Sequence, residues 1–296
     1  MRKAKFLILI CAAAAVLSLA LVDRAQDNAG VIKVEVHLVE VYATVFDHKG
    51  YYVDGLGRGS FEVYEDGKRQ QISSFETQSQ GLSCAILLDT SGSMAEALPR
   101  VKNSIVKFID QLDSHDMVAI YTFDQRLVTR QEFTTDKGMA KRAVLRTRAE
   151  GGTALFDSLS EVSLETSARS GKKAIVVFTD GDDNSSALTA NTTASRAAKL
   201  GIPLYAIAAG EATRSKHLRA TLNELSQRTG GATYEVKRPT DTEGVFLDVT
   251  HDLQHLYMIS YHAPAGPADG RWRKIDLAVK GMKKYSIRAK EGYYPD

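Results

Sequence analysis

The chain has 296 residues, of which 44% are hydrophobic and 25% charged, the balance of a globular protein with a packed core. Its formal net charge of +2 excludes the strongly basic surface that is typical of nucleic-acid-binding proteins, so no nucleic acid is expected as a partner. The length is sufficient for about two domains.

The first 25 residues have the composition of an export signal. A basic start at 2–5 precedes the uncharged apolar run 6–22, and Ser18 and Ala20 are small residues of the kind that a signal peptidase reads. We therefore predict a signal peptide or leader at 1–25 and a secreted, periplasmic or cell-envelope protein. The apolar run just reaches the lower limit for a membrane-spanning helix, so membrane attachment is expected only if it stays uncleaved.

The next segment, 31–80, has the alternating pattern of β-strands with one buried face. Residues 31–46 alternate most regularly, and shorter strands are predicted at 61–64 and 71–75, with turns between them. No segment of helical periodicity appears before Cys84. These strands predict the N-terminal part of a small β-sandwich.

Strands and helices alternate in the segment 81–255. Apolar runs predict strands at 84–88, 116–123, 173–179, 202–208 and 232–236, with an edge arm at 126–133. Helical spacing predicts helices at 95–112, 136–149, 154–168, 190–200, 215–229 and 240–255. This alternation predicts an α/β domain with a doubly wound, mostly parallel, Rossmann-like sheet.

The last segment, 256–296, returns to the β pattern. Either flank alone would leave unpaired strand edges, which promote aggregation. We therefore predict that 31–80 and 256–296 form one β-sandwich, into which the α/β domain at 81–255 is inserted. The predicted C-terminal strands are 257–261, 272–279 and 285–289.

The strand at 84–88 runs directly into Asp89, Ser91 and Ser93. In an open α/β sheet, ligands bind beyond the carboxyl ends of the strands, so these side chains are expected where a ligand would arrive. All three offer hard oxygen atoms, the ligands that Mg²⁺ and Ca²⁺ prefer. They are therefore candidate metal ligands.

Two further stretches complete a known pattern. Thr153 follows two glycines in a loop, and Asp180 ends a second buried strand in Phe-Thr-Asp-Gly. With Asp89, Ser91 and Ser93, they resemble the metal-ion-dependent adhesion site of von Willebrand factor type A (VWA) domains. The β flanks, through the stretches 54–67 and 288–294, resemble a bacterial VWFA-related family.

The resemblance implies a role for each of these residues. Ser91, Ser93 and, in the high-affinity state, Thr153 would bind Mg²⁺ directly, with Mn²⁺ and Ca²⁺ as alternatives. Asp89 and Asp180 would hold the ion largely through water. One position would stay open for the carboxylate of a protein ligand.

The function that follows is a non-enzymatic binding or adhesion module that captures an acidic protein ligand. Ser91 does not lie in the Gly-x-Ser-x-Gly pattern of hydrolase nucleophiles, and no histidine is placed beside it as a base. Two alternatives stay open: a metal-dependent enzyme or enzyme subunit, and a structural cation site in an envelope scaffold. The sequence identifies neither the ligand nor the oligomeric state.

Overall fold

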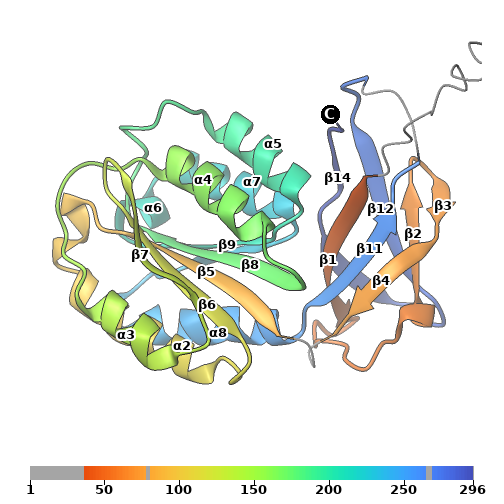
Figure 1. The fold of residues 1–296 in the computed structure, drawn as a ribbon, viewed down its shortest axis with the longest axis horizontal. Coiled ribbons are helices and arrows are strands. Elements are labelled where there is room, and N and C mark those ends of the chain that lie inside the picture. The colour runs from red at the N-terminus through yellow and green to blue at the C-terminus, as the bar shows by residue number, and fades with distance from the viewer. Residues whose placement is uncertain (1–36, 78–80, 265–268, 296) are drawn as a thin grey trace, which may run out of the picture. The chain divides into compact units, whose positions relative to one another are not determined.

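The computed structural model describes residues 37–77, 81–264 and 269–295, and the predicted leader at 1–25 lies outside them. The described chain contains one six-stranded sheet with helices on both faces and two four-stranded antiparallel sheets (Figure 1).

The six-stranded sheet has the order β10-β9-β8-β5-β6-β7, in which every pair is parallel except β6 and β7. Its strands are β5 Leu82–Asp89, β6 Met117–Phe123, β7 Leu127–Thr134, β8 Lys172–Thr179, β9 Leu204–Ala208 and β10 Ala232–Glu235. All eight residues of β5 are buried, because this strand lies inside the sheet with helices on both sides. Its continuous apolar run reflects that position.

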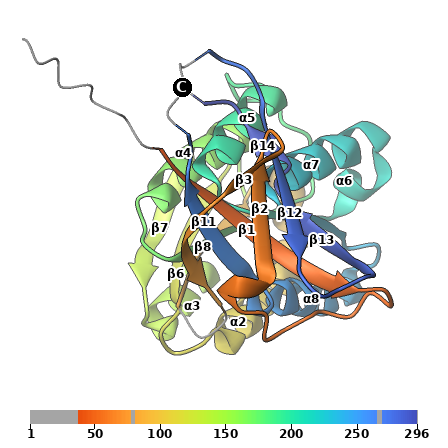
Figure 2. The ribbon, with the colours of Figure 1, turned by 90° about the vertical axis from the view of Figure 1, so that its right-hand side faces the viewer.

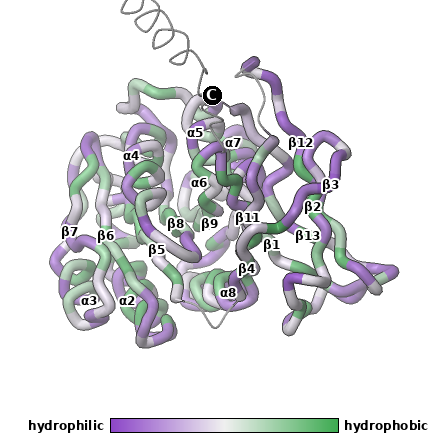
Figure 3. The backbone as a smooth tube through the Cα atoms, turned by 45° about the vertical axis from the view of Figure 1, so that its right-hand side comes forward, coloured by the Kyte–Doolittle hydropathy of each residue, from purple (hydrophilic) through white to green (hydrophobic). Residues whose placement is uncertain are grey.

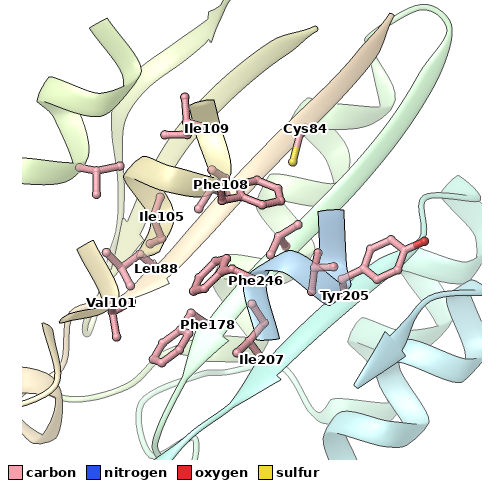
Figure 4. Packing of buried hydrophobic residues seen from close by; sticks show 14 of the residues in the cluster. Cys84, Leu88, Val101, Ile105, Phe108, Ile109, Phe178, Tyr205, Ile207 and Phe246 are labelled. Carbon is pink, nitrogen blue, oxygen red and sulfur yellow. The ribbon is translucent and has the colours of Figure 1, made fainter. Parts of the chain in front are cut away.

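Helices cover both faces of this sheet. One face packs against α2 Leu98–Gln111, α3 Lys137–Leu145 and α8 Thr242–Gln254. The other packs against α4 Leu155–Ser167, α5 Ala190–Leu200, α6 Gly210–Arg214 and α7 Lys216–Thr229. In β5, Cys84 and Leu88 face the first group of helices (Figure 4). Leu87 faces the second group.

Several helix ends follow local sequence signals. The side chains of Asp136 and Ser215 accept hydrogen bonds from backbone N–H groups in the first turns of α3 and α7. Gly201 and Gly230 end α5 and α7 in the left-handed conformation, with φ of 70° and 83°. Figure 3 shows that hydrophobic residues are frequent in strands of the six-stranded sheet and in the helices α2, α3 and α8 that pack on it.

The two flanks of the chain share two antiparallel sheets (Figure 2). One has the order β13-β1-β11-β4 and the other β14-β12-β2-β3. Their strands are β1 Leu38–Asp47, β2 Phe61–Glu65, β3 Lys68–Gln70, β4 Ile72–Glu76, β11 Tyr257–His262, β12 Arg273–Val279, β13 Tyr285–Ala289 and β14 Gly292–Tyr293.

Strand pairing between the flanks is extensive. Strand β1 pairs with β11 and β13, whereas β2 pairs with β12, so residues more than 200 positions apart are hydrogen-bonded neighbours. Side chains of both sheets form one buried cluster that includes Val41, Val63, Ile259 and Ile275. The predicted fold class is therefore confirmed, whereas the domain boundaries at 31–80, 81–255 and 256–296 stay a prediction.

Some short elements were not predicted. Strand β3, Lys68–Gln70, lies between the predicted strands at 61–64 and 71–75, where only a turn was expected. Strand β14 and helix α6 were also missed, since two and five residues carry too little periodicity to be recognised. Within the described ranges, no helix has both the length and the apolar content that crossing a membrane requires.

The last turn of α8 is tied to the β-sandwich through a buried carboxylate. Asp252 accepts hydrogen bonds from the hydroxyls of Tyr52, at 2.6 Å, and Tyr234. Its Oδ2 also lies 2.7 Å from a guanidinium nitrogen of Arg288 on β13.

A second ion pair joins the same two parts of the chain, since Lys173 Nζ of β8 lies 2.9 Å from Glu40 Oε2 of β1. Both connections hold the α/β part of the chain to the strands of the flanks.

Candidate metal site

The candidate site begins where β5 ends. Asp89 is fully buried, and its two carboxylate oxygens accept hydrogen bonds from the backbone N–H of Ser91, at 2.8 Å, and from Thr179 Oγ1, at 2.7 Å. The Oγ atoms of Ser91 and Ser93 lie 3.0 Å apart. The tight turn after the strand thus places the carboxylate and both hydroxyls close together.

The other two predicted residues meet this turn from neighbouring loops. Ser93 Oγ donates a hydrogen bond of 2.8 Å to Asp180 Oδ1. A methyl group on Gly181 would lie 3.8 Å from both Ser93 Oγ and Thr153 Oγ1, so these two hydroxyls border the same small space. Ser93, Thr153 and Asp180 also line one cavity of about 740 Å³. The structure therefore brings all five predicted residues to one end of the sheet.

Burial changes the acidity of both carboxylates. Removal from water raises the pKa of Asp89 from 3.8 to about 6, although hydrogen bonds from Ser91 and Thr179 oppose the change. Burial also raises the pKa of Asp180, against the hydrogen bond from Ser93. No lysine, arginine or histidine of the described residues forms an ion pair with either carboxylate. Two buried, uncompensated carboxylates are costly to ionise unless a cation accompanies them.

The backbone of Thr153 is held by the loop that follows β8. Asn184 Oδ1 accepts the backbone N–H of Thr153 at 3.0 Å, and the backbone N–H of Asn184 donates to the carbonyl of Thr153 at 3.0 Å. A Cβ on Gly152 would lie 2.8 Å from Ser185 Oγ and 2.9 Å from Asn184 Oδ1, so a side chain there would displace the Asn184 side chain from its present position. Asn184 therefore fixes the position from which the Thr153 hydroxyl enters the site.

Comparison with known proteins shows the family of this chain. The family model of the von Willebrand factor type A domain matches residues 84–247, which is more than half of the chain. The chain belongs to the von Willebrand factor type A domain family. VWA domains are mostly non-enzymatic interaction modules, and they often bind a divalent metal ion.

One curated relative and two solved structures illustrate the similarity. Uncharacterized protein sll0103 of Synechocystis sp. is 33% identical over 126 residues, a match that covers 38% of this chain and 29% of that protein. The chain thus matches less than a third of this relative's length.

The two solved structures show the fold alone at their low sequence identities. A von Willebrand factor type A protein from Catenulispora acidiphila is 15% identical with a TM-score of 0.50, over 87% of this chain and 74% of that one. Proximal thread matrix protein 1 from the mussel byssus is 19% identical with a TM-score of 0.52, over 65% and 50% of the two chains.

Two residues that support the candidate site were not predicted from the sequence. Thr179 lies inside the Phe-Thr-Asp-Gly stretch, and its hydroxyl binds Asp89. Asn184 lies in the acidic run 180–184, which resembles a calcium loop only faintly because the required glycine and glutamate are missing. The local sequence around Thr179 and Asn184 does not indicate these contacts, because each partner lies in a distant segment of the chain.

A second group of metal-ligand residue types lies at the opposite end of the VWA sheet. Asp113, His115 and Asp116 place one ligand atom each within 4.8 Å of one another, just before β6. However, Asp116 already accepts the backbone N–H groups of Leu82 and Asp113, and Lys137 Nζ donates to its carbonyl. These hydrogen bonds stabilise the loop before β6 and account for the position of Asp116, so we assign the cluster no ligand.

Proposed function

We propose that this VWA protein is an exported binding module that captures an acidic protein ligand through a divalent cation. The residues that would hold the cation are Asp89, Ser91, Ser93, Thr153 and Asp180. The proposal of export depends on the basic start and apolar run of residues 2–22.

The observation that carries this proposal is the convergence of two buried carboxylates and three hydroxyls without a positively charged partner. Asp89 and Asp180 gain compensation for their charge when a cation binds, and this favours binding. Two carboxylates balance the charge of a divalent ion, but in the proposed arrangement they hold it largely through water. The direct protein ligands are then neutral hydroxyls, so the ion stays electrophilic toward a ligand carboxylate. This composition supports a cation-dependent contact with an acidic side chain.

Mg²⁺ is the ion that we propose, with Mn²⁺ and Ca²⁺ as alternatives. Hydroxyl and carboxylate oxygens suit all three ions, but Mg²⁺ retains several water molecules readily and therefore needs few protein ligands. A binding role agrees with the family, whose domains are mostly interaction modules.

The proposal predicts one Mg²⁺ site and a cation-dependent partner. Isothermal titration calorimetry on the chain is expected to show binding of one Mg²⁺ ion. A pull-down from the native envelope fraction is expected to recover a partner in Mg²⁺ and to lose it in EDTA. A partner that persists in EDTA, with stability alone reduced, would instead indicate a structural cation.

The contacts of Asn184 lead to a prediction about metal affinity. Replacing Asn184 by alanine removes the acceptor that holds the Thr153 backbone, so we expect Mg²⁺ affinity to fall about tenfold, as for other residues that orient a ligand without touching the metal. Asn184→Asp keeps an acceptor oxygen and is expected to bind Mg²⁺ at least as tightly as the wild type. Calorimetry measures both affinities.

Asp157 provides a matched control for loosening of the same loop. Its carboxylate accepts the backbone N–H groups of Ala187 and Leu188, both at 2.9 Å, away from Thr153. Asp157→Ala is expected to lower the melting temperature while leaving Mg²⁺ affinity within about twofold of the wild type. Equal losses of affinity in Asp157→Ala and Asn184→Ala would show that Asn184 acts only on loop stability.

A further inference from the structure

The segment 137–148 is strongly basic: it contains five lysine and arginine residues and no acidic residue. It forms helix α3 and the turn after it. Arg146 and Arg148, which follow the helix, are both exposed, as is Arg100 in the first turn of α2. Lys102 Nζ donates to the carbonyl of Leu145 at 2.9 Å and so joins the start of α2 to the end of α3.

Neighbouring lysines on the same two helices have acidic partners. Lys141 Nζ lies 2.6 Å from Asp110 Oδ1, and Lys107 Nζ lies 2.6 Å from Glu243 Oε2. Within the described part of the chain, Arg100, Arg146 and Arg148 form no ion pair. Stabilisation of the α3 dipole does not explain Arg148, because this residue lies beyond the helix end at Leu145.

One of the three arginines lines the cavity of the candidate metal site, and the other two precede a segment that contacts the turn after β5. Arg100 lines the same cavity as Ser93, Thr153 and Asp180. The segment after Arg148 runs along the turn that follows β5, because the N–H of Glu150 donates to the carbonyl of Thr90 at 2.7 Å. One residue further, the carbonyl of Gly151 accepts the N–H of Gly92 at 3.1 Å.

We propose that Arg100, Arg146 and Arg148 form a basic rim that binds further carboxylates of the partner, beside the carboxylate on the cation. The inference rests on the proposed cation-dependent function and adds the class of partner: a segment with several acidic residues close together. Arginine suits this role because its planar guanidinium binds carboxylates in bidentate geometry. A rim of this kind increases the association rate and selects acidic partners over those with a single carboxylate.

The surroundings of the rim favour an acidic peptide over a membrane or a nucleic acid. The loop after Asp180 adds two further acidic residues to the lining of the cavity, Asp182, which is exposed, and Asp183. A phosphate-rich surface spanning this region would meet negative charge as well as the arginines. A peptide avoids that repulsion, since one carboxylate meets the cation and the others extend over the rim only.

The test compares two synthetic peptides by fluorescence anisotropy in Mg²⁺ and in EDTA. One contains six consecutive glutamates, and the other contains one glutamate between glycines. We expect the wild type to bind the hexaglutamate peptide more tightly, and only in Mg²⁺. The double variant Arg146→Ser/Arg148→Ser is expected to lose about tenfold in affinity for hexaglutamate. Its affinities for Mg²⁺ and for the single-glutamate peptide should not change.

The matched control is Lys283→Ser/Lys284→Ser, which removes the same charge from an exposed turn between β12 and β13. It is expected to bind both peptides like the wild type. Unchanged hexaglutamate binding in the arginine variant, or an equal loss in the lysine control, would overturn the rim while leaving the cation site intact. Failure of the wild type to bind Mg²⁺ would instead refute the proposed function.

Two other polyanions are included to test the class of partner. Heparin and vesicles containing anionic phospholipid are expected to bind the arginine variant at least as tightly as they bind the lysine control. If either one binds the wild type without Mg²⁺ and loses affinity specifically in the arginine variant, the rim serves a polyanion or a membrane, and the acidic-peptide proposal is wrong.

Discussion

Replacing Asp89 by asparagine is expected to abolish Mg²⁺ binding and to stabilise the metal-free protein. The substitution removes a negative charge from the centre of the proposed site, so the affinity should fall by about 100-fold or more. The same substitution removes a carboxylate that is fully buried without a cation, and this relieves the cost of ionising it. Calorimetry measures the first effect, and urea unfolding in EDTA measures the second.

The size of the gain in stability follows from the pKa. A value of about 6 in the folded protein, against 3.8, corresponds to about 3 kcal/mol at pH 7. The gain in Asp89→Asn is smaller than this by the hydrogen-bond energy that the amide loses with Ser91 or Thr179. Asp124→Asn is the control, because Asp124 follows the neighbouring strand β6 and its side chain, among the described residues, accepts just the backbone N–H of Arg126.

The dependence on pH separates this explanation from a general loss of folding. Because the folded pKa is raised, the metal-free wild type should lose stability as the pH rises from about 4 to about 6, with no further loss above. Mg²⁺ affinity should decrease as the pH falls below about 6, because protonated Asp89 does not attract a cation. If Asp89→Asn showed the same pH profile of stability as the wild type, the buried carboxylate would not be the titrating group.

Replacing Asp252 by alanine is expected to destabilise the protein by about 3–5 kcal/mol, which is the usual cost of breaking a buried ion pair from one side. Asp252 is 1% exposed, and its removal leaves Arg288 and the hydroxyls of Tyr52 and Tyr234 without their acceptor. For a chain of this size, the melting temperature should fall by about 10 °C. Differential scanning calorimetry measures the change.

Two further variants isolate the cause of this loss. Asp248→Ala removes an exposed carboxylate from the same helix, one turn earlier, and is expected to change stability by less than about 0.5 kcal/mol. Asp252→Leu/Arg288→Met replaces both charges by apolar groups and should recover the part of the loss that comes from the unpaired Arg288, but not the part from the hydroxyls of Tyr52 and Tyr234. A single variant Asp252→Ala as stable as the wild type would show that the pair does not hold α8 to the sandwich.

The arrangement of the candidate site was largely predictable from the sequence, for a physical reason. Ser91 and Ser93 follow Asp89 within one turn, so their proximity needs no distant contact. Asp180 ends a second apolar run, and parallel buried strands bring their carboxyl ends to the same edge of a sheet. The doubly wound, mostly parallel class of the sheet followed similarly from the alternation of strands and helices, whose crossovers have one preferred hand.

Tertiary structure decided the rest, because the partners come from distant parts of the chain. Nothing near Asn184 indicates that it holds Thr153, and nothing near Asp252 indicates that Arg288 and Tyr52 surround it. Alternation predicts that a strand has a buried face, but not which strand will lie beside it. Only the folded chain shows that β1 lies between β11 and β13, since strand pairing is selected by the complementary packing of whole sheets.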